Sequence, residues 1–170
     1  LSLVGSEMCI RDRINILDTP GFSDYVGETI SALSVVETAV LVNNATVGVD
    51  ATTENAWRQA EKTHTPVLFV INQLDHEKAN FDQVVVQLKD FFGEKVTIAQ
   101  YPVNAGEGFD SVIDLMLMKM LKCSKGGGKP EILDIPASEK AKAEKLHLTL
   151  IENAAEGSEE LMEKYFTDDT

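Results

Sequence analysis

The first residues of the chain that could do chemistry follow a short apolar run, INIL, at residues 14–17. Asp18 comes directly after that run, and Gly21 follows it in the sequence DTPG. A carboxylate at the end of a strand can orient a magnesium-bound water, and a flexible backbone N–H beside it can donate to a terminal phosphate. Asp, Pro and Gly also dominate ordinary turns, so this D-x-x-G pattern alone fits a plain strand-to-turn connection as well.

A second polar group follows another apolar run and consists of Asn72, Gln73, Leu74 and Asp75. A carboxylate at Asp75 can accept hydrogen bonds from the N1–H and the exocyclic amine of guanine. Adenine lacks both donors, so this carboxylate would reject ATP by leaving a charge unpaired. Asn72 can bridge the base edge and a neighbouring loop. Alone, the tetrapeptide also fits a strand-end turn, and only its order and spacing relative to DTPG favour a nucleotide site.

Alternating strands and helices surround both groups. Apolar runs predict buried strands at 14–17, 38–45 and 65–72, and helical spacing predicts helices over 22–37, within 45–64 and over 80–93. Thr52 or Thr53 is the expected N-cap of the middle helix, and Gly93 closes the last. This alternation predicts an α/β fold with a doubly wound, mostly parallel sheet, whose ligands bind at the carboxyl ends of the strands.

The pattern changes after Gly93, and we expect a smaller α+β lobe over residues 94–170. Residues 94–110 predict a strand with a glycine-rich exit, and residues 111–123 fit either a helix or a strand. The sequence SKGGGKPE predicts a hairpin turn before another short strand, and two helices broken near Gly157 are expected after it. The expected organisation is therefore a segment over 1–12, a central α/β region over 13–93, and this lobe.

Composition limits the class of protein. The chain has 170 residues, of which 44% are hydrophobic and 25% are charged, as in soluble globular domains. Its net charge of −13 opposes adhesion to nucleic acid or anionic membrane, so we expect no direct DNA binding and no membrane partner. Cys9 and Cys123 lack the spacing of a disulfide framework or a zinc site, and a cytoplasmic location is expected.

The two ends are unlike the rest of the sequence. Residues 1–12, LSLVGSEMCIRD, lack an initiator Met and a regular hydrophobic period. They resemble translated adapter or cloning sequence, and no element is predicted there. The other end stops within the acidic run ELMEKYFTDDT. We therefore expect an internal fragment of a longer protein.

Several segments together resemble the GTP-binding domain of translational GTPases, and most closely that of elongation factor G. They are INILDTPGF, ETAVLVNNATVGVDATTENAWRQA, PVLFVINQLD and ANFDQVVVQLKDFFG. The segments YPVNAGEGFDSVIDLMLMKM and AAEGSEELMEKYF resemble the insert lobe of elongation factor G. The resemblance implies a P-loop-type GTPase fold in which VIDLMLMKM is a strand. It also implies GTP or GDP and magnesium as ligands, and the ribosome as a partner.

The DTPG sequence carries the phosphate side of this resemblance. Asp18 matches the family's magnesium-associated aspartate, which acts on the metal through water, and Gly21 matches the γ-phosphate sensor of the second switch. Thr19 and Pro20 lie between them and belong to the same nucleotide-binding set.

The base side of the resemblance lies at residues 72–75. Asn72 and Asp75 match the guanine-reading residues. Gln73 stands where the family usually has Lys, whose aliphatic stem packs over the base. Gln covers less of the base and brings no charge, so we expect guanine recognition to persist with some loss of affinity.

Phe22 is the larger departure from the family, which usually has a His here to orient the attacking water once the ribosome docks. Phe has no hydrogen-bonding atom, so we assign no catalytic residue and expect hydrolysis slower by on the order of 10² to 10⁴. In the alternative, Phe22 packs under the second switch and another group positions the water.

The phosphate loop of the family, G-x-x-x-x-G-K-S/T, does not occur in the chain. In SKGGGKPE, Lys129 is followed by Pro130 where a Ser or Thr is needed. The sequence thus contains only part of a nucleotide site, and we expect no GTP hydrolysis by this chain alone.

The resemblance implies a divergent elongation factor G paralogue that acts on the ribosome, in tRNA–mRNA translocation or in ribosome release. Two alternatives stay open at this point. One is a non-catalytic, GTP-sensing module that binds the ribosome, and the other is a relative of ribosome-protection proteins or release factors. Whether the protein is an enzyme therefore depends on its rate of hydrolysis.

Overall fold

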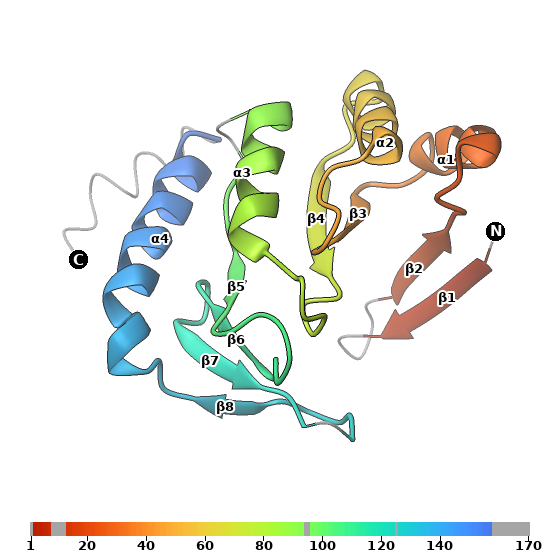
Figure 1. Cartoon of the computed structure of the whole chain (residues 1–170). Coiled ribbons are helices and arrows are strands. Elements are labelled where there is room, and N and C mark those ends of the chain that lie inside the picture. Colours follow the sequence, from red (N-terminus) through yellow and green to blue (C-terminus); the bar gives the residue numbers. More distant parts are fainter. Residues whose placement is uncertain (1, 8–12, 94–95, 125, 158–170) are drawn as a thin grey trace. The chain divides into compact units, whose positions relative to one another are not determined.

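The computed structural model of the chain describes residues 2–7, 13–93, 96–124 and 126–157 (Figure 1). The chain divides into two compact units, Leu1–Asn72 and Gln73–Thr170, and each is described by itself. The division falls after Asn72, so the helix that follows belongs to the second unit. The domain boundary expected near Gly93 stays a prediction.

The first unit begins with an antiparallel pair of strands, β1 (Ser2–Glu7) and β2 (Arg13–Asp18). The register pairs Ser2 with Asp18 and Glu7 with Arg13. β2 is the apolar strand predicted before DTPG, but it is not buried as expected, since Ile14 and Ile16 are 41% and 47% exposed. No element was predicted over residues 2–7, but an unpaired edge strand presents a row of free N–H and C=O groups, and β1 pairs with those of β2.

A parallel pair of strands forms the centre of the first unit. β3 (Ala39–Asn44) and β4 (Val67–Asn72) run in register from Ala39 beside Val67 to Asn44 beside Asn72. Helix α2 (Ala51–Lys62) connects them, as expected for parallel neighbours, which cannot be joined by a short hairpin (Figure 1). The predicted α/β class with a parallel sheet is thereby confirmed.

Two helices cover one face of this strand pair. Helix α1 (Val26–Leu33) follows a 3-10 turn, η1 (Ser23–Tyr25), and is shorter than the helix predicted over 22–37. The β-branched pair at 35 and 36 disfavours its extension. The core on this face consists of Leu33, Ala39 and Ala60, with Val36 and Val67 packed against them.

Trp57 of α2 also belongs to this covered face. Its ring stacks on that of Phe69 in β4, with centroids 5.7 Å apart and planes 18° apart. An offset stack of this kind stabilises the packing beyond what the apolar area buried by the two rings contributes. The helix is thus held to the sheet at a second point beyond Ala60.

The opposite face of β3 and β4 is apolar but largely exposed. Side chains alternate between the two faces of a strand, and the alternate positions here are Val40, Val42, Leu68 and Val70. Their exposed fractions are 54%, 61%, 51% and 39%. Parallel sheets are ordinarily covered on both faces, but the described helices of the first unit cover only the other face of this pair.

The second unit begins with helix α3 (Phe81–Phe92), close to the helix predicted over 80–93. The side chain of Asn80 caps it by accepting from the backbone N–H of Gln83. Gly93 ends it with φ of 94°, a value that glycine adopts without steric cost. The expected glycine stop is confirmed.

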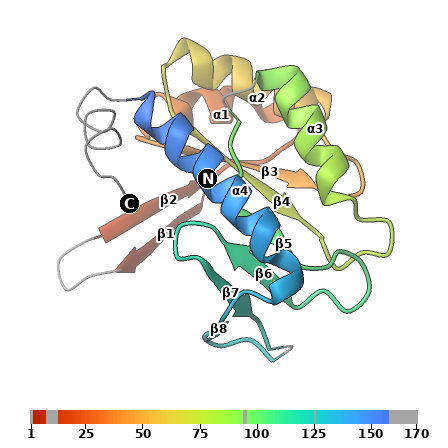
Figure 2. The ribbon, with the colours of Figure 1, turned by 90° about the vertical axis from the view of Figure 1, so that its left-hand side faces the viewer.

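A four-stranded antiparallel sheet and a long helix complete the second unit. The strands are β5 (Gln100–Pro102), β6 (Ser111–Asp114), β7 (Lys119–Lys122) and β8 (Glu131–Leu133), paired in that order. Helix α4 (Ala137–Ala155) lies across this sheet (Figure 2). The unit has the α+β composition predicted for the lobe, and the helix expected after Gly157 lies outside the described residues.

Residues 111–123 form two strands rather than the single helix or strand that the sequence and the resemblance offered. The carboxylate of Asp114 accepts the backbone N–H groups of Met116 and Leu117, at 2.9 and 2.8 Å. This side-chain turn, followed by a left-handed Met118 (φ 49°), reverses the chain into β7. The turn predicted at SKGGGKPE is confirmed and joins β7 to β8.

The core of the second unit lies between α4 and the sheet. Tyr101, Ile113, Leu115 and Ala143 are each at most 1% exposed. The hydroxyl of Tyr101 donates to Oε2 of Glu139 at 3.3 Å, and burial together with that negative charge raises the pKa of Tyr101 to about 12. Among the helices of the described residues, none has the length and apolarity to cross a membrane.

Candidate functional site

Two of the predicted base-side residues, Gln73 and Asp75, line an open hollow in the second unit, whereas Asn72 is not part of its lining. Its volume is about 550 Å³, and its lining consists of Gln73, Asp75, His76, Glu77 and Glu107. That volume lies within the range of sites for small ligands. All of these residues have polar or charged side chains and three of them carry carboxylates, so the hollow suits a ligand that presents hydrogen-bond donors. Guanine does so along the edge that carries N1–H and the exocyclic amine.

The backbone around Gln73 explains why two polar side chains face this hollow. Gln73 has φ of 61°, a left-handed conformation that few residues other than glycine adopt and that is often found at functional sites. The carbonyl of Gln73 accepts the N–H of His76 at 3.2 Å, which closes a turn. Leu74 between them is buried, whereas Gln73 and Asp75 are exposed. The buried leucine anchors the loop and leaves its two neighbours on the surface.

Asn72 ends β4 in the first unit, directly before this loop. It lies beside Asn44 in the register, and its carbonyl accepts the N–H of Ala45 at 2.9 Å. Its side chain is exposed. Asn43, one position earlier on β3, is buried and donates from Nδ2 to the hydroxyl of Thr53 at 2.9 Å. The predicted polar groups at the carboxyl ends of the two strands are therefore present, although Asn43 serves the packing of α2.

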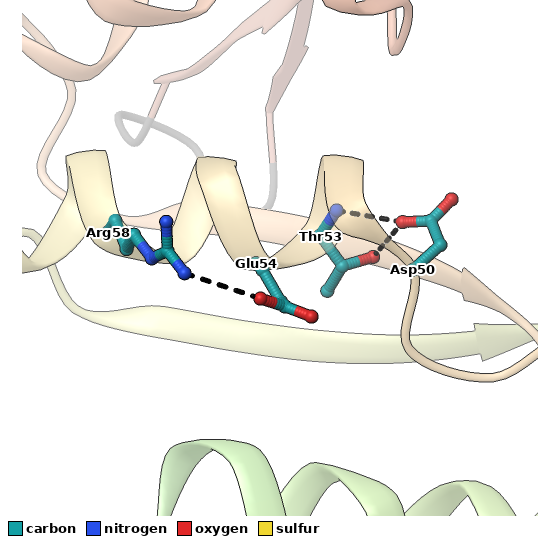
Figure 3. Close-up of polar contacts among 4 residues, drawn as sticks. All are labelled: Asp50, Thr53, Glu54 and Arg58. Atoms are coloured by element: carbon teal, nitrogen blue, oxygen red, sulfur yellow. Dashed lines mark hydrogen bonds and ion pairs between the residues drawn. The ribbon is translucent and has the colours of Figure 1, made fainter.

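Asp50 rather than Thr52 or Thr53 caps α2, which corrects the sequence-based expectation (Figure 3). Its Oδ1 accepts the N–H of Thr53 at 2.8 Å and the hydroxyls of Thr52 and Thr53 at 2.7 and 2.8 Å. Partial burial opposes ionisation, but these hydrogen bonds outweigh it and hold the pKa of Asp50 below its ordinary value. One turn further on, Glu54 and Arg58 form an ion pair at 3.4 Å.

The phosphate-side residues follow β2 in the first unit. Asp18 is the last residue of that strand and is exposed, and Thr19 and Pro20 are half-buried. Gly21 is exposed, and a Cβ added there would meet nothing within 4 Å. A carboxylate and a backbone turn are thus both open to a ligand. The predicted phosphate-side residues and Asn72 lie in the first unit, whereas Gln73 and Asp75 lie in the second.

The donor set at Asp18 fits a magnesium ion of the kind that nucleotide sites use. Across the described ranges, no cluster of three or more His, Cys, Asp or Glu side chains is arranged to hold a metal. Magnesium at phosphate sites is typically held by one or two carboxylates together with water and the phosphates themselves. The exposed carboxylate of Asp18 can therefore contribute one ligand group of such a site.

Phe22 is 75% exposed. Its carbonyl accepts the N–H of Tyr25 at 3.0 Å and so starts η1, but its ring does not pack into a core. The alternative in which Phe22 packs beneath the second switch is therefore not what this structure has. An exposed ring without polar atoms cannot orient water.

The sequence did not point to the part of the hollow formed by the β5–β6 loop. Glu107 belongs to that loop and lies 32 positions after Asp75 in the chain. The only signal was the glycine-rich exit predicted over residues 94–110. That signal predicts a loop but not what the loop contacts.

Comparison with known proteins agrees with these observations. The sequence model of the elongation factor Tu GTP-binding domain matches residues 9–164. The chain is also similar to a protein from Thermus thermophilus in a crystal structure, with a TM-score of 0.85 and 25% sequence identity. That similarity covers 99% of this chain and 25% of the other, so the chain spans about a quarter of that protein's length. The chain belongs to the family of the elongation factor Tu GTP-binding domain.

Proposed function

We propose that this chain is the GTP-binding part of an elongation factor G-like protein that acts on the ribosome in the cytoplasm, in tRNA–mRNA translocation or in ribosome release. The observation that carries the proposal is the hollow lined by Gln73 and Asp75, in a chain that matches a GTP-binding family over residues 9–164. The sheet β5–β8 with α4 stands where the resemblance expects the insert lobe of elongation factor G, which favours that member of the family.

The base is recognised by three residues in this proposal. Asp75 accepts two hydrogen bonds from guanine and excludes adenine, because adenine would leave the carboxylate unpaired. Gln73 covers part of the base plane with its aliphatic stem. Asn72 bridges the base edge and a neighbouring loop.

The phosphates are recognised at the turn after β2. Asp18 holds the magnesium through water, and the backbone N–H of Gly21 donates to the γ-phosphate. Thr19 and Pro20 fix the backbone between Asp18 and Gly21. When bound, the metal neutralises charge on the phosphate oxygens. The space around Gly21, where an added Cβ would meet nothing within 4 Å, leaves room for a phosphate beside its N–H.

Phe22 makes this protein a slow GTPase in the proposal. The test is ribosome-stimulated GTP hydrolysis by the full-length protein that contains this chain, comparing native protein with Phe22→His. We expect the His variant to be faster by on the order of 10² to 10⁴, because an imidazole at this position can orient the attacking water. Tyr25→His is the matched control, since it places an imidazole on another exposed aromatic position of the same segment.

The outcomes separate the proposal from its alternatives. A native protein that already turns over as fast as Phe22→His, or a Tyr25→His variant that is equally accelerated, contradicts the role given to Phe22. If both native and Phe22→His bind GTP without hydrolysing it, the non-catalytic GTP-sensing module is the correct function. Full-length protein that binds GTP no better than ATP overturns the base recognition.

A further inference from the structure

The loop between β5 and β6 is hydrogen-bonded to the predicted base-reading loop. The backbone N–H of Gly106 donates to the carbonyl oxygen of Leu74 at 2.7 Å. Leu74 is buried and lies between Gln73 and Asp75, and Gly106 is buried as well. This bond joins residues 32 positions apart. It is therefore a tertiary contact made at the centre of the recognition loop.

Gly106 has a conformation that other residues rarely adopt. Its φ is 95°, which an L side chain disfavours because of its Cβ. A Cβ built at this position would lie 3.9 Å from the carbonyl oxygens of both His76 and Glu77, an ordinary contact distance. Space alone would accept a methyl group, so a substitution acts by straining the backbone and displacing the N–H.

The β5–β6 loop is braced internally as well. The N–H of Phe109 donates to the carbonyl of Gly106 at 3.1 Å, and Nδ2 of Asn104 donates to the carbonyl of Gly108 at 3.2 Å. The strands on either side are paired antiparallel. A loop with fixed ends and internal hydrogen bonds can hold a neighbouring segment in place. Glu107 of the same loop lines the hollow together with the recognition residues.

We infer that Gly106 is a positioning residue for guanine recognition: its N–H fixes the carbonyl of Leu74 and thereby directs Gln73 and Asp75 into the hollow. This inference rests on the proposed function, in which Asp75 reads the base. Recognition groups must be held closely in place to discriminate between ligands, and that support comes from residues that do not touch the ligand. A displaced Leu74 should therefore weaken discrimination between bases more than it weakens the fold.

The test measures base discrimination by this chain with three nucleotides. The probes are guanosine, inosine and adenosine 5′-monophosphate, because inosine keeps N1–H but lacks the exocyclic amine. Dissociation constants come from the amide chemical shifts of residues 73–75. For Gly106→Ala we expect a loss of about tenfold in guanosine monophosphate affinity and a smaller guanosine-to-inosine ratio, since a strained residue shifts the loop.

Gly127→Ala is the matched control. Gly127 also has a positive φ, 75°, and its Cβ would meet nothing within 4 Å, but it lies in the β7–β8 turn. This variant should carry similar backbone strain. It should leave unchanged both the affinity for guanosine monophosphate and the ratio of the guanosine to the inosine monophosphate affinity. If Gly106→Ala keeps the native guanosine-to-inosine ratio, the positioning role is wrong although the proposed function stands. If the native chain binds guanosine monophosphate no more tightly than adenosine monophosphate, the base recognition assigned to Asp75 fails and this inference with it.

A second measurement needs no variant, so it applies even if Gly106→Ala does not fold. Hydrogen exchange at the Gly106 amide should be slow in the native chain. Saturation with guanosine monophosphate should slow it further, because a ligand that binds only the closed loop suppresses its opening. Exchange as fast as in an unstructured peptide, or exchange that bound nucleotide leaves unchanged, overturns the inference.

Discussion

In the candidate site, the backbone and the side chain of Gln73 have different roles. Its left-handed φ of 61° turns the chain at the end of β4, and its exposed side chain lines the hollow. The sequence predicted the polar cluster at residues 72–75 because strand ends can be located from hydrophobic runs. It could not predict the left-handed backbone, since glutamine has no preference for that region.

The side chain at residue 73 should set the affinity for guanine nucleotides without setting the fold. Gln73→Lys is expected to raise that affinity several-fold, since a longer stem covers more of the base. Gln73→Gly is the control: it suits the left-handed backbone at least as well but provides no cover, so it should weaken binding. Titration with guanosine monophosphate measures both, and a lysine variant that binds no better than native would contradict the role of the side chain.

At the residue scale, the sequence did not identify Gly106 and Glu107 as neighbours of residues 73–75. A glycine-rich stretch predicts a turn, but Gly106 contacts Leu74 only because the chain folds back over 32 positions. Periodicity and turn chemistry are local signals, so they do not identify such partners. The same limit applies to Asn43, whose hydrogen bond to Thr53 depends on where α2 packs.

At the scale of elements, the sequence predicted for most segments whether they form a helix or a strand, but it did not predict the residues at which these elements begin and end. β3, β4, α2 and α3 follow from apolar runs and helical spacing. The cap of α2 was assigned to Thr52 or Thr53, because Thr is a good cap, but Asp50 accepts from both of them. The segment over 111–123 alternates like one strand, and only the turn made by Asp114 divides it.

The cap of α2 should make a measurable, pH-dependent contribution to stability. Asp50→Ala is expected to lower the free energy of unfolding by about 1 kcal/mol at neutral pH, the usual cost of losing such a cap. The folded pKa of Asp50 lies below its ordinary value of 3.8, so its ionised form contributes above that pH. This contribution is lost as the pH falls through the folded pKa.

Urea unfolding of native protein, Asp50→Ala and Asp50→Asn at several pH values measures this effect. The difference between native and Asp50→Ala should shrink as the pH falls below 3.8. Asn is also a good cap but does not titrate, so Asp50→Asn should stay close to native at neutral pH and lack that decrease. A gap between native and Asp50→Ala that is constant with pH would show that the charge contributes nothing.

At the scale of the whole molecule, the two units have unequal cores. The first unit buries Leu33, Ala39 and Ala60 between its helices and the strand pair, and leaves the other face of that pair exposed. The second has a core cluster of four buried residues, including Tyr101 and Ile113, with eight partly buried hydrophobic residues packed around them. Since buried apolar area is the main stabilising contribution, the first unit should be the less stable.

Urea unfolding should therefore show two transitions. Trp57 is the only tryptophan and lies in the first unit, so its fluorescence should change at lower urea than the second transition in far-UV circular dichroism. Ile113→Ala removes a fully buried side chain from the second unit and should cost about 2–5 kcal/mol there, with the Trp57 transition unchanged. Coincident transitions by both probes would show that the chain unfolds as one cooperative body.

The left-handed backbone at Gln73 also bears on how this site can change by mutation. A β-branched residue is strongly disfavoured at φ of 61°, whereas long unbranched side chains share the same modest cost. Lysine and glutamine codons differ by a single nucleotide, so an exchange between them is genetically short and leaves the main chain undisturbed. An exchange between histidine and phenylalanine at position 22 needs more than one nucleotide change. An exchange between lysine and glutamine at residue 73 is therefore more easily reversed than an exchange between histidine and phenylalanine at residue 22.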